Sequence, residues 1–277
     1  MIKHYKDRYY AHFLNALFPS KLGIVFLLLI VMETMHIYSA YGQTLFQAHT
    51  FSYRNQGILK YRLLKPDHIK KGKKYPLVLF FHGSGQRGDD NFSQLKWGVR
   101  QFATKRNRRK YPAFVVAPQC PANTQWVDIN YDNFPVRLPS QPSKYIVLSI
   151  QLVLHLEKTL PVDTRRIYVT GLSSGGYATW AGIERMPYLF AAAIPVAGGG
   201  DSQKANLIAH LPIWAFQGGR DDEVPPKFTN SMITALKSVG GRPRYTFYSN
   251  SGHSETWIKA YHSRSLYRWL FHQKKKK

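Results

Sequence analysis

The chain has 277 residues, of which 44% are hydrophobic and 14% aromatic, so it can bury a large core and general disorder is excluded. It carries 39 Lys and Arg residues against 15 Asp and Glu, a formal net charge of +24, and such a surface attracts polyanions. The basic residues are spread along the whole chain, and no helix-turn-helix, zinc-finger or RNA-recognition pattern occurs. We therefore predict a solvated basic surface with weak attraction to anionic surfaces and no nucleic-acid partner.

The single cysteine, Cys120, excludes an intrachain disulfide and a cysteine-based metal cluster. It lies between Gln119 and Pro121 at the end of a predicted strand, and no reactive-cysteine pattern surrounds it. This setting favours a buried or half-buried thiol over a nucleophile.

Residues 1–42 have the pattern of an export signal. Basic residues precede an apolar run of eleven residues at 22–32, which is short for a membrane helix. Ala40 and Gly42 place small residues where a signal peptidase reads, which predicts cleavage before Gln43. We expect an exported protein, whether periplasmic, extracellular or at the cell surface. An uncleaved membrane anchor over residues 22–32 is the alternative, because the basic segment is long.

The remainder, residues 43–277, has the length of a single domain. Strand and helix patterns alternate along it, which predicts an α/β fold: a mostly parallel central sheet with helices on both faces. The proline-rich stretch from Pro118 to Ser143 is typical of a loop that caps a site. The predicted strands are 57–64, 77–81, 114–117, 166–170, 191–196, 213–216 and 245–248, and the predicted helices are 144–160, 177–184, 226–239 and 255–271.

A G-x-S-x-G pattern, Gly171-Leu172-Ser173-Ser174-Gly175, stands between a predicted strand and a predicted helix. In that context the pattern indicates a nucleophile elbow, in which a strained turn lifts the serine hydroxyl clear of the sheet. Small residues at Gly171 and Gly175 let strand and helix approach closely. The pattern favours Ser173 as a nucleophile, and a glycine-rich turn that merely connects the two elements is the alternative.

Asp221 and His253 complete the chain order Ser, Asp, His. Asp221 follows the predicted strand 213–216, and open parallel sheets place functional groups at the carboxyl ends of strands. Asp222 can serve instead, and either aspartate can cap the following helix. His253 comes soon after the predicted strand 245–248, in a predicted strand-exit loop. We predict that this imidazole accepts the serine proton while a carboxylate fixes its tautomer.

The run His82-Gly83-Ser84-Gly85 follows the predicted strand 77–81. Acyl transfer requires two N–H donors aimed at the tetrahedral oxyanion. We predict one from the backbone of Ser174 and the other from Ser84 or Gly85, while His82 holds the loop by hydrogen bonds. A phosphate-binding loop is disfavoured, because the Gly-Lys-Ser/Thr ending of such loops is missing.

The aromatic-rich segment with Trp126 and Tyr131 is a candidate lining for the acyl or sugar site. We expect Trp126 and His82 to contribute to substrate binding, and packing in the core or lid is the alternative.

These motifs resemble an α/β-hydrolase family of predicted secreted peptidases and carboxylesterases related to polyhydroxybutyrate depolymerases and to feruloyl or acetylxylan esterases. The resemblance implies the α/β-hydrolase fold, with Ser173 as nucleophile, Asp221 as acid and His253 as base. Ser174 stands where this family often has methionine, and Gln217 where it often has histidine. Both departures bear on substrate preference rather than on mechanism. The resemblance covers nearly all of the chain downstream of residue 57, through the stretches 76–91, 116–121, 166–180, 191–201, 212–225 and 252–254.

We therefore predict an exported serine hydrolase that cleaves carboxylic esters, with acyl groups on polysaccharides as candidate substrates and without a metal or cofactor. A serine peptidase of the same fold is the alternative, because ester and amide hydrolysis share these motifs. A third hypothesis, of another class, is a catalytically silent surface module that binds acidic glycans through its positive charge.

Overall fold

The computed structural model describes residues 45–54 and 57–276. The chain divides into units of residues 1–44 and 45–277, and nearly all of the second unit is described. The predicted export signal, its apolar run at 22–32 and the predicted cleavage before Gln43 therefore lie outside the described residues. Among the residues that are described, no helix is both long enough and apolar enough to cross a lipid bilayer.

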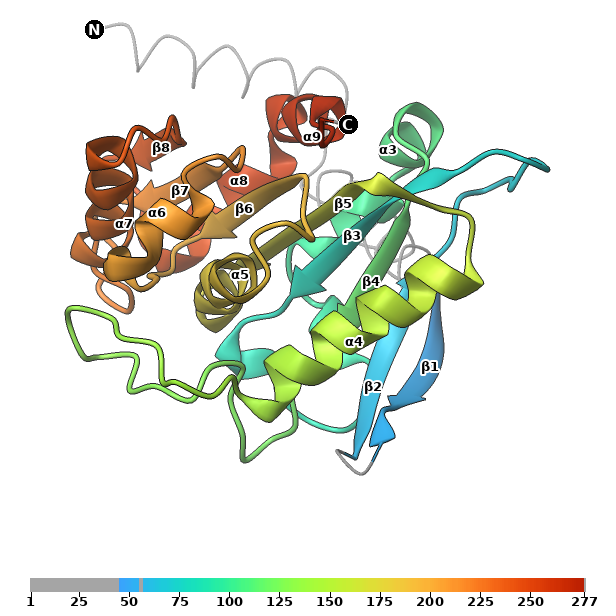
Figure 1. The fold of residues 1–277 in the computed structure, drawn as a ribbon, viewed down its shortest axis with the longest axis horizontal. Coiled ribbons are helices and arrows are strands. Elements are labelled where there is room, and N and C mark those ends of the chain that lie inside the picture. The colour runs from blue at the N-terminus through green and yellow to red at the C-terminus, as the bar shows by residue number, and fades with distance from the viewer. Residues whose placement is uncertain (1–44, 55–56, 277) are drawn as a thin grey trace, which may run out of the picture. The chain divides into compact units, whose positions relative to one another are not determined.

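The described part of the chain forms an eight-stranded sheet in the order β1-β2-β4-β3-β5-β6-β7-β8 (Figure 1). β2 pairs antiparallel with both of its neighbours, and every other pairing is parallel. The carboxyl ends of β3 to β8 therefore meet at one edge of the sheet. The strands are β1 (Phe46–Ser52), β2 (Ile58–Leu64), β3 (Tyr75–Phe81), β4 (Phe114–Pro118), β5 (Val162–Leu172), β6 (Ala192–Val196), β7 (Trp214–Gly218) and β8 (Arg244–Tyr248).

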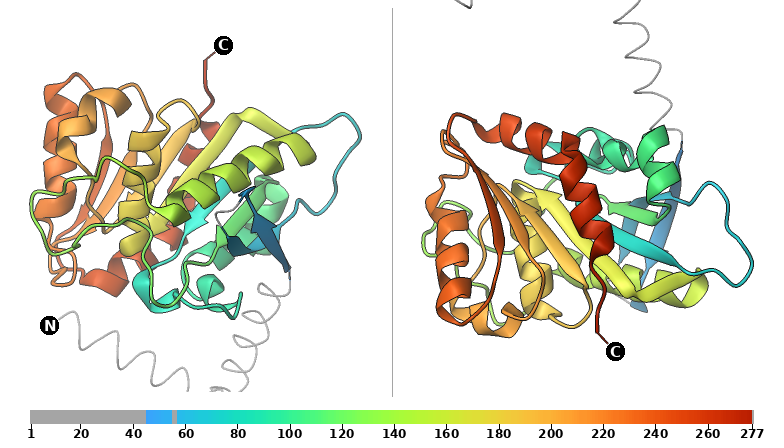
Figure 2. Two further views of the ribbon diagram at one scale, coloured as in Figure 1. Left: turned by 60° about the horizontal axis from the view of Figure 1, so that its bottom comes forward. Right: turned by 90° about the horizontal axis from the view of Figure 1, so that it is seen from above.

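Helices cover both faces of this sheet (Figure 2). One hydrophobic cluster joins the sheet to α4, α5, α6 and α7, and a second joins it to η4, α8 and α9. The α-helices are α3 (Lys105–Lys110), α4 (Lys144–Thr159), α5 (Ser174–Arg185), α6 (Ala205–Ile208), α7 (Lys227–Ser238), α8 (His253–His262) and α9 (Arg264–His272), and the short 3-10 helices are η2 (Ser84–Gln86), η3 (Ser93–Leu95), η4 (Val99–Ala103) and η5 (Ser202–Lys204).

The apolar run of β3 explains how the sheet holds two cores. All of its seven residues are buried, as a strand covered on both faces requires. Leu77, Leu79 and Phe81 enter the first cluster, whereas Val78 and Phe80 enter the second. The two-residue period of a strand thus divides one continuous apolar run between opposite faces.

The predicted mostly parallel sheet with helices on both faces is confirmed. The differences in detail include the following three. β1 was not predicted, because only Phe46 and Phe51 of this edge strand are buried and the apolar pattern is weak. The predicted helix 255–271 is two helices, since Ser263 adopts an extended backbone. The helix after the elbow begins at Ser174 rather than at residue 177.

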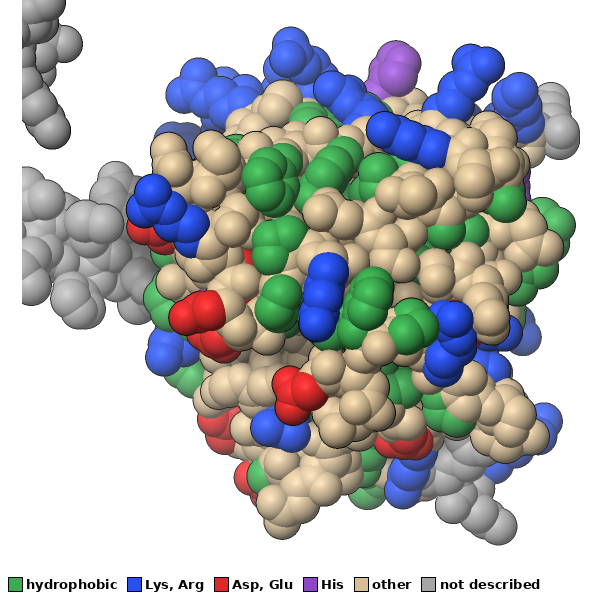
Figure 3. Space-filling model, turned by 90° about the vertical axis from the view of Figure 1, so that its left-hand side faces the viewer, with side chains coloured by type: hydrophobic (Ala, Val, Ile, Leu, Met, Phe, Trp, Pro, Cys, Tyr) green, Lys and Arg blue, Asp and Glu red, His purple; other side chains and the backbone are tan. Residues whose placement is uncertain are grey.

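Lys and Arg side chains are scattered over the face shown in Figure 3 and are most crowded along its upper rim. Most of the acidic side chains visible on this face lie in its lower half. Because acidic and basic side chains are unevenly distributed, parts of this face carry local negative charge although the chain is strongly basic.

The turn between β5 and α5 depends on direct contact between backbones. A Cβ atom on Gly175 would collide with the carbonyl group of Phe81, at the end of β3, and one on Gly171 would collide with the backbone of Gly175. Backbone atoms cannot move aside as a flexible side chain can. Both positions therefore require glycine because of close approach.

We expect Gly175→Ala to lower the free energy of unfolding by about 3 kcal/mol or more, because an added methyl group overpacks a rigid contact. Gly182→Ala, on the same helix, is the matched control: apart from its chain neighbours and the backbone of its own helix, no atom lies within 4 Å of the added Cβ. Alanine there is expected to raise stability by up to about 1 kcal/mol through its helix propensity. Guanidinium unfolding measures both variants, and a Gly175→Ala protein as stable as the wild type contradicts this account.

Candidate active site

Ser173 stands at the turn from β5 into α5 with a strained backbone. Its φ is 56° and its ψ is −123°, a conformation that costs a non-glycine residue energy. The turn is held because the Ser173 N–H donates to the carbonyl of Val196 at 3.0 Å. Strand, strained serine and helix together form the elbow that the G-x-S-x-G pattern predicts.

His253 connects the serine to an acid. Its Nε2 lies 2.9 Å from Ser173 Oγ, and its Nδ1 lies 2.7 Å from Asp221 Oδ2. The imidazole is 3% exposed, and the ring of Trp257 packs against it with 4.6 Å between centroids. The carboxylate therefore sets the proton on Nδ1 and leaves Nε2 to accept a proton from the serine.

His253 is the first residue of α8, not part of a strand-exit loop as the sequence predicted. β8 ends at Tyr248, and a short turn separates the two elements. Two backbone hydrogen bonds tie this turn to the segment that carries the acid: Gly219 N–H to Tyr248 O, and Arg220 N–H to Ser251 O. The loops that carry the acid and the base thus form one bonded unit.

Asp221, rather than Asp222, contacts the histidine. The Asp221 side chain is fully buried, and its Oδ1 accepts a hydrogen bond from the Val224 N–H at 2.8 Å. Asp222 is exposed. The α7 helix that follows has Pro226 at its N-cap and no side-chain cap, so the capping role expected of an aspartate is not observed.

Gln217 is a positioning residue whose role the sequence did not reveal. Its Nε2 donates to Asp221 Oδ2 at 3.2 Å and also faces the carbonyl oxygens of Gly218 and Val224. Its Oε1 accepts from the Thr229 hydroxyl at 2.7 Å. Three oxygens around the amide nitrogen fix the orientation of this buried side chain. The sequence did mark the position, as a glutamine where the family that the motifs resemble often has histidine.

The loop that is predicted to supply an oxyanion donor begins beside Ser173. A Cβ built on Gly83 would lie 3.4 Å from the Cβ of Ser173, so the η2 turn, which begins with Ser84 and Gly85, stands directly against the serine. Ser174 is the first residue of α5, and the N–H groups of a first helical turn have no partner within the helix. The positive end of that helix dipole favours a negative charge at this point.

His82 holds the loop that is predicted to supply an oxyanion donor. Its Nδ1–H donates to the carbonyl of Gly83 at 2.7 Å, and its Nε2 accepts from the Cys120 N–H at 2.9 Å. Only 1% of His82 is exposed, and burial lowers its pKa to about 4. The imidazole is therefore neutral at pH 7, with its tautomer fixed by these two bonds.

Trp126 also holds the loop that begins at His82. It is 1% exposed, its indole N–H donates to the carbonyl of His82 at 3.0 Å, and its ring packs against Phe81. Neither Trp126 nor His82 reaches the surface, so the expected contact with substrate is corrected to core packing. Cys120 is buried as predicted, and burial raises the pKa of its thiol to about 11.

An aromatic cluster lies one helical turn beyond Ser173. The ring of Tyr177 is 4.8 Å from Tyr131 and 5.9 Å from Phe228, and Phe134 is 5.5 Å from Phe228. Tyr131 and Phe134 belong to the long loop between β4 and α4, which therefore lies against the first turns of α5 and α7 (Figure 1). This cluster is a candidate wall for an acyl group, with Phe134 46% exposed.

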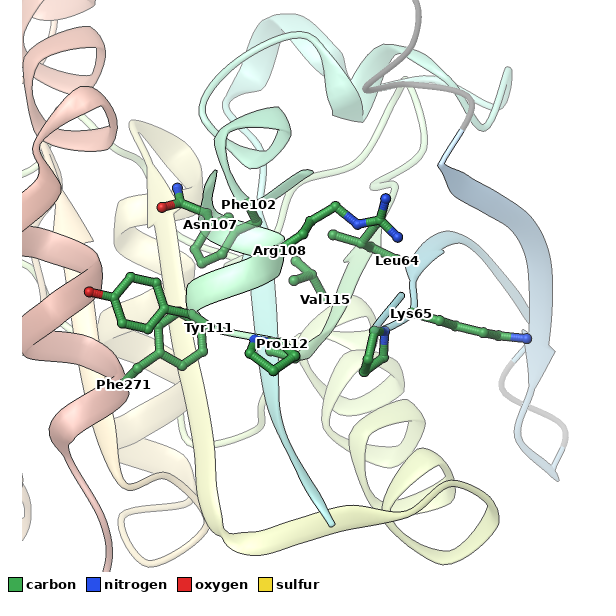
Figure 4. A pocket seen from close by; sticks show the side chains of 11 residues that line it. Leu64, Lys65, Phe102, Asn107, Arg108, Tyr111, Pro112, Val115 and Phe271 are labelled. Atoms are coloured by element: carbon green, nitrogen blue, oxygen red, sulfur yellow. The ribbon is translucent and has the colours of Figure 1, made fainter. Parts of the chain in front are cut away.

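The pocket in Figure 4 does not belong to this site. Leu64 ends β2 and Val115 lies near the start of β4, so the pocket opens at the edge of the sheet opposite Ser173. Its volume of about 10 Å³ holds a single water molecule at most. A larger hollow of about 380 Å³ lies beside Arg87 and Lys144, at the edge where β3 ends.

Comparisons with known proteins agree with this fold. A model of the prolyl oligopeptidase family matches residues 149–214, which include Ser173 but neither Asp221 nor His253. The structure of a thermostable esterase is 38% identical with a TM-score of 0.78, and the match covers 84% of this chain and 64% of that one. This chain thus spans less than two thirds of that esterase. A comparison with curated proteins found no match.

More distant structures share the fold alone. An acylaminoacyl peptidase of Pyrococcus horikoshii is 18% identical with a TM-score of 0.64, over 84% of this chain and 42% of that one. A putative dipeptidyl aminopeptidase IV of Bacteroides ovatus is 16% identical with a TM-score of 0.61, over 83% and 36%. The chain has the α/β-hydrolase fold.

The buried His82 predicts a dependence of stability on pH. In the unfolded chain the His82 imidazole takes up a proton near pH 6.5, whereas in the folded protein it does so only near pH 4. The free energy of unfolding therefore falls as the pH drops from 6.5 to 4. The loss through this one group is about 3 kcal/mol. His82→Gln lacks the titrating group and is expected to lose less between pH 7 and pH 4. Guanidinium unfolding at both pH values compares the two proteins, and equal losses contradict the assignment.

Proposed function

We propose that this chain is a serine hydrolase that cleaves carboxylic esters through an acyl-enzyme. The observation that carries the proposal is the continuous chain of contacts from Ser173 through His253 to Asp221, built on a strained elbow. The 38% identity to a thermostable esterase supports the ester bond as the target. The resemblance to carboxylesterases related to polyhydroxybutyrate depolymerases and to feruloyl or acetylxylan esterases points in the same direction.

The mechanism follows from these atoms. Ser173 Oγ passes its proton to His253 Nε2 as it attacks the ester carbonyl, and Asp221 stabilises the imidazolium that forms. The N–H of Ser174 and an N–H of Ser84 or Gly85 bind the oxyanion. His253 then returns the proton to the leaving alcohol, which leaves an acyl group on Ser173. Water hydrolyses this intermediate through the same histidine.

A peptidase is the second candidate. The match of residues 149–214 to the prolyl oligopeptidase family favours it. Aryl esters and peptide amides assayed side by side on the same preparation distinguish the two, since both bonds use the same residues. The third hypothesis, a silent surface module for acidic glycans, predicts salt-sensitive binding without turnover of either bond.

The proposal also covers the substrate and the location of the protein. The substrate is proposed to be an acyl group carried by a polysaccharide, on the strength of the resemblance to feruloyl and acetylxylan esterases. The protein is proposed to be exported, on the strength of the basic and apolar pattern over residues 3–32. Acetylated and feruloylated oligosaccharides test the first statement, and the mass of the mature N-terminus tests the second.

Asp221→Asn is expected to lower kcat by about 10⁴-fold, because the amide favours the wrong histidine tautomer while the geometry stays intact. Asp222→Asn is the matched control and is expected to keep the wild-type rate, since Asp222 is exposed and does not contact His253. Initial rates on an aryl acetate measure both variants. Equal losses in the two variants, or a full rate in Asp221→Asn, contradict the assignment of the acid.

A further inference from the structure

A second carboxylate lies close to the histidine. Glu223 Oε2 is 3.7 Å from His253 Nε2, whereas Asp221 contacts Nδ1 on the opposite side of the ring. Nε2 is also the nitrogen that faces Ser173 Oγ. The Glu223 side chain is 72% exposed, so its carboxylate stands at the solvent side of the reacting atoms.

Glu223 has no cation of its own. Within residues 45–54 and 57–276, no Lys or Arg nitrogen lies within 4.0 Å of its carboxylate, and its one ionisable neighbour at that distance is His253. Other acids on this basic chain do pair with arginine: Asp67 with Arg108, and Asp201 with Arg137. While His253 is neutral and ready to accept a proton, the charge of Glu223 is therefore unbalanced.

Neither of the basic residues close to Glu223 in the sequence fills this place. Arg220, three residues upstream, forms no ion pair with Glu223 within 4.0 Å. The next one, Lys227, is directed elsewhere. The Lys227 ammonium lies over the rings of Phe134 and Phe228, 5.3 and 5.5 Å from their centroids. These rings belong to the aromatic cluster beside the site, so that cluster already attracts a cation. The Lys227 ammonium is thus held over these rings and is not paired with Glu223.

We propose that the Glu223 carboxylate is a subsite for a positively charged group of the substrate, such as an ammonium close to the scissile bond. This inference rests on the proposed hydrolysis at Ser173. The substrate class it names is esters with a cationic acyl or alcohol part, and esters with an anionic group at the same place are disfavoured.

The net charge of +24 does not overrule this preference. Exposed charges are screened over about 8 Å at physiological salt, so Lys and Arg residues farther than this from Ser173 act weakly on a group bound there. A unit pair about 4 Å apart in water changes an equilibrium about fivefold. The Glu223 carboxylate therefore decides whether a positive or a negative substrate group is favoured, and the expected preference is about fivefold.

The test compares two esters of equal shape: acetylthiocholine, which carries a quaternary ammonium, and 3,3-dimethylbutyl thioacetate, its neutral isostere. At 0.15 M salt, the wild type is expected to favour the cationic ester about fivefold in kcat/KM. Glu223→Gln keeps the shape and removes the charge, so its ratio is expected to fall to about one. Asp222→Asn, at the neighbouring exposed acid, is the control that keeps the wild-type ratio.

The proposal is overturned if Glu223→Gln leaves the ratio of the two esters unchanged. If both rates fall equally at that unchanged ratio, Glu223 acts on His253 rather than on the substrate. If Ser173 reacts with a fluorophosphonate but neither ester is turned over, the readout is instead the protection of Ser173 from labelling by a cation. Tetramethylammonium must then slow labelling of the wild type and leave Glu223→Gln unaffected. A protein that neither labels nor hydrolyses defeats the proposed function itself, and the subsite with it.

Discussion

The contact between the backbones of β3, β5 and α5 is the constraint on which the site depends. Gly171 and Gly175 leave no room for a Cβ, so the chain can leave β5 and start α5 immediately, with Ser173 strained between them. The same contact places the end of β3 against the elbow. The η2 turn that follows β3 is thereby fixed beside the serine without a direct bond to it.

Buried hydrogen bonds then fix the acid and the base. Asp221 is fully buried and accepts from three donors: the imidazole of His253, the amide of Gln217 and the N–H of Val224. A buried carboxylate is costly unless its lone pairs are satisfied, and bonds to a charged group are each worth about 1.5–3 kcal/mol. Gln217 therefore contributes to stability and to the orientation of the acid together. His82 does the same for the oxyanion loop, where a neutral imidazole bonds on both sides.

Much of this arrangement can be predicted from the sequence, because it depends on local pattern. Apolar runs such as 77–81 predict buried strands, and G-x-S-x-G between strand and helix predicts an elbow at Ser173. Chain order and the position after a strand select His253 and the pair Asp221 and Asp222, but they cannot separate the two aspartates. Only burial and a measured contact with the imidazole do so.

The remainder depends on distances between segments far apart in the sequence. Trp126 looks like a site residue because it is aromatic and near a loop, yet it packs under His82. Glu223 looks like one more surface acid, and nothing in its neighbours along the chain places it beside His253 Nε2. A weakly amphipathic edge strand such as β1 also escapes pattern analysis, because its pairing with β2 rather than its own sequence makes it a strand.

The central claim is that Ser173 is an activated nucleophile. Intact-mass analysis of the folded protein after reaction with a fluorophosphonate tests it most directly, with Ser173→Ala as the control. The account predicts that the wild type gains the mass of one phosphonyl group, located on Ser173 by peptide mapping, and that Ser173→Ala gains none. A wild-type protein that stays unlabelled, or a Ser173→Ala protein that labels equally, would contradict it.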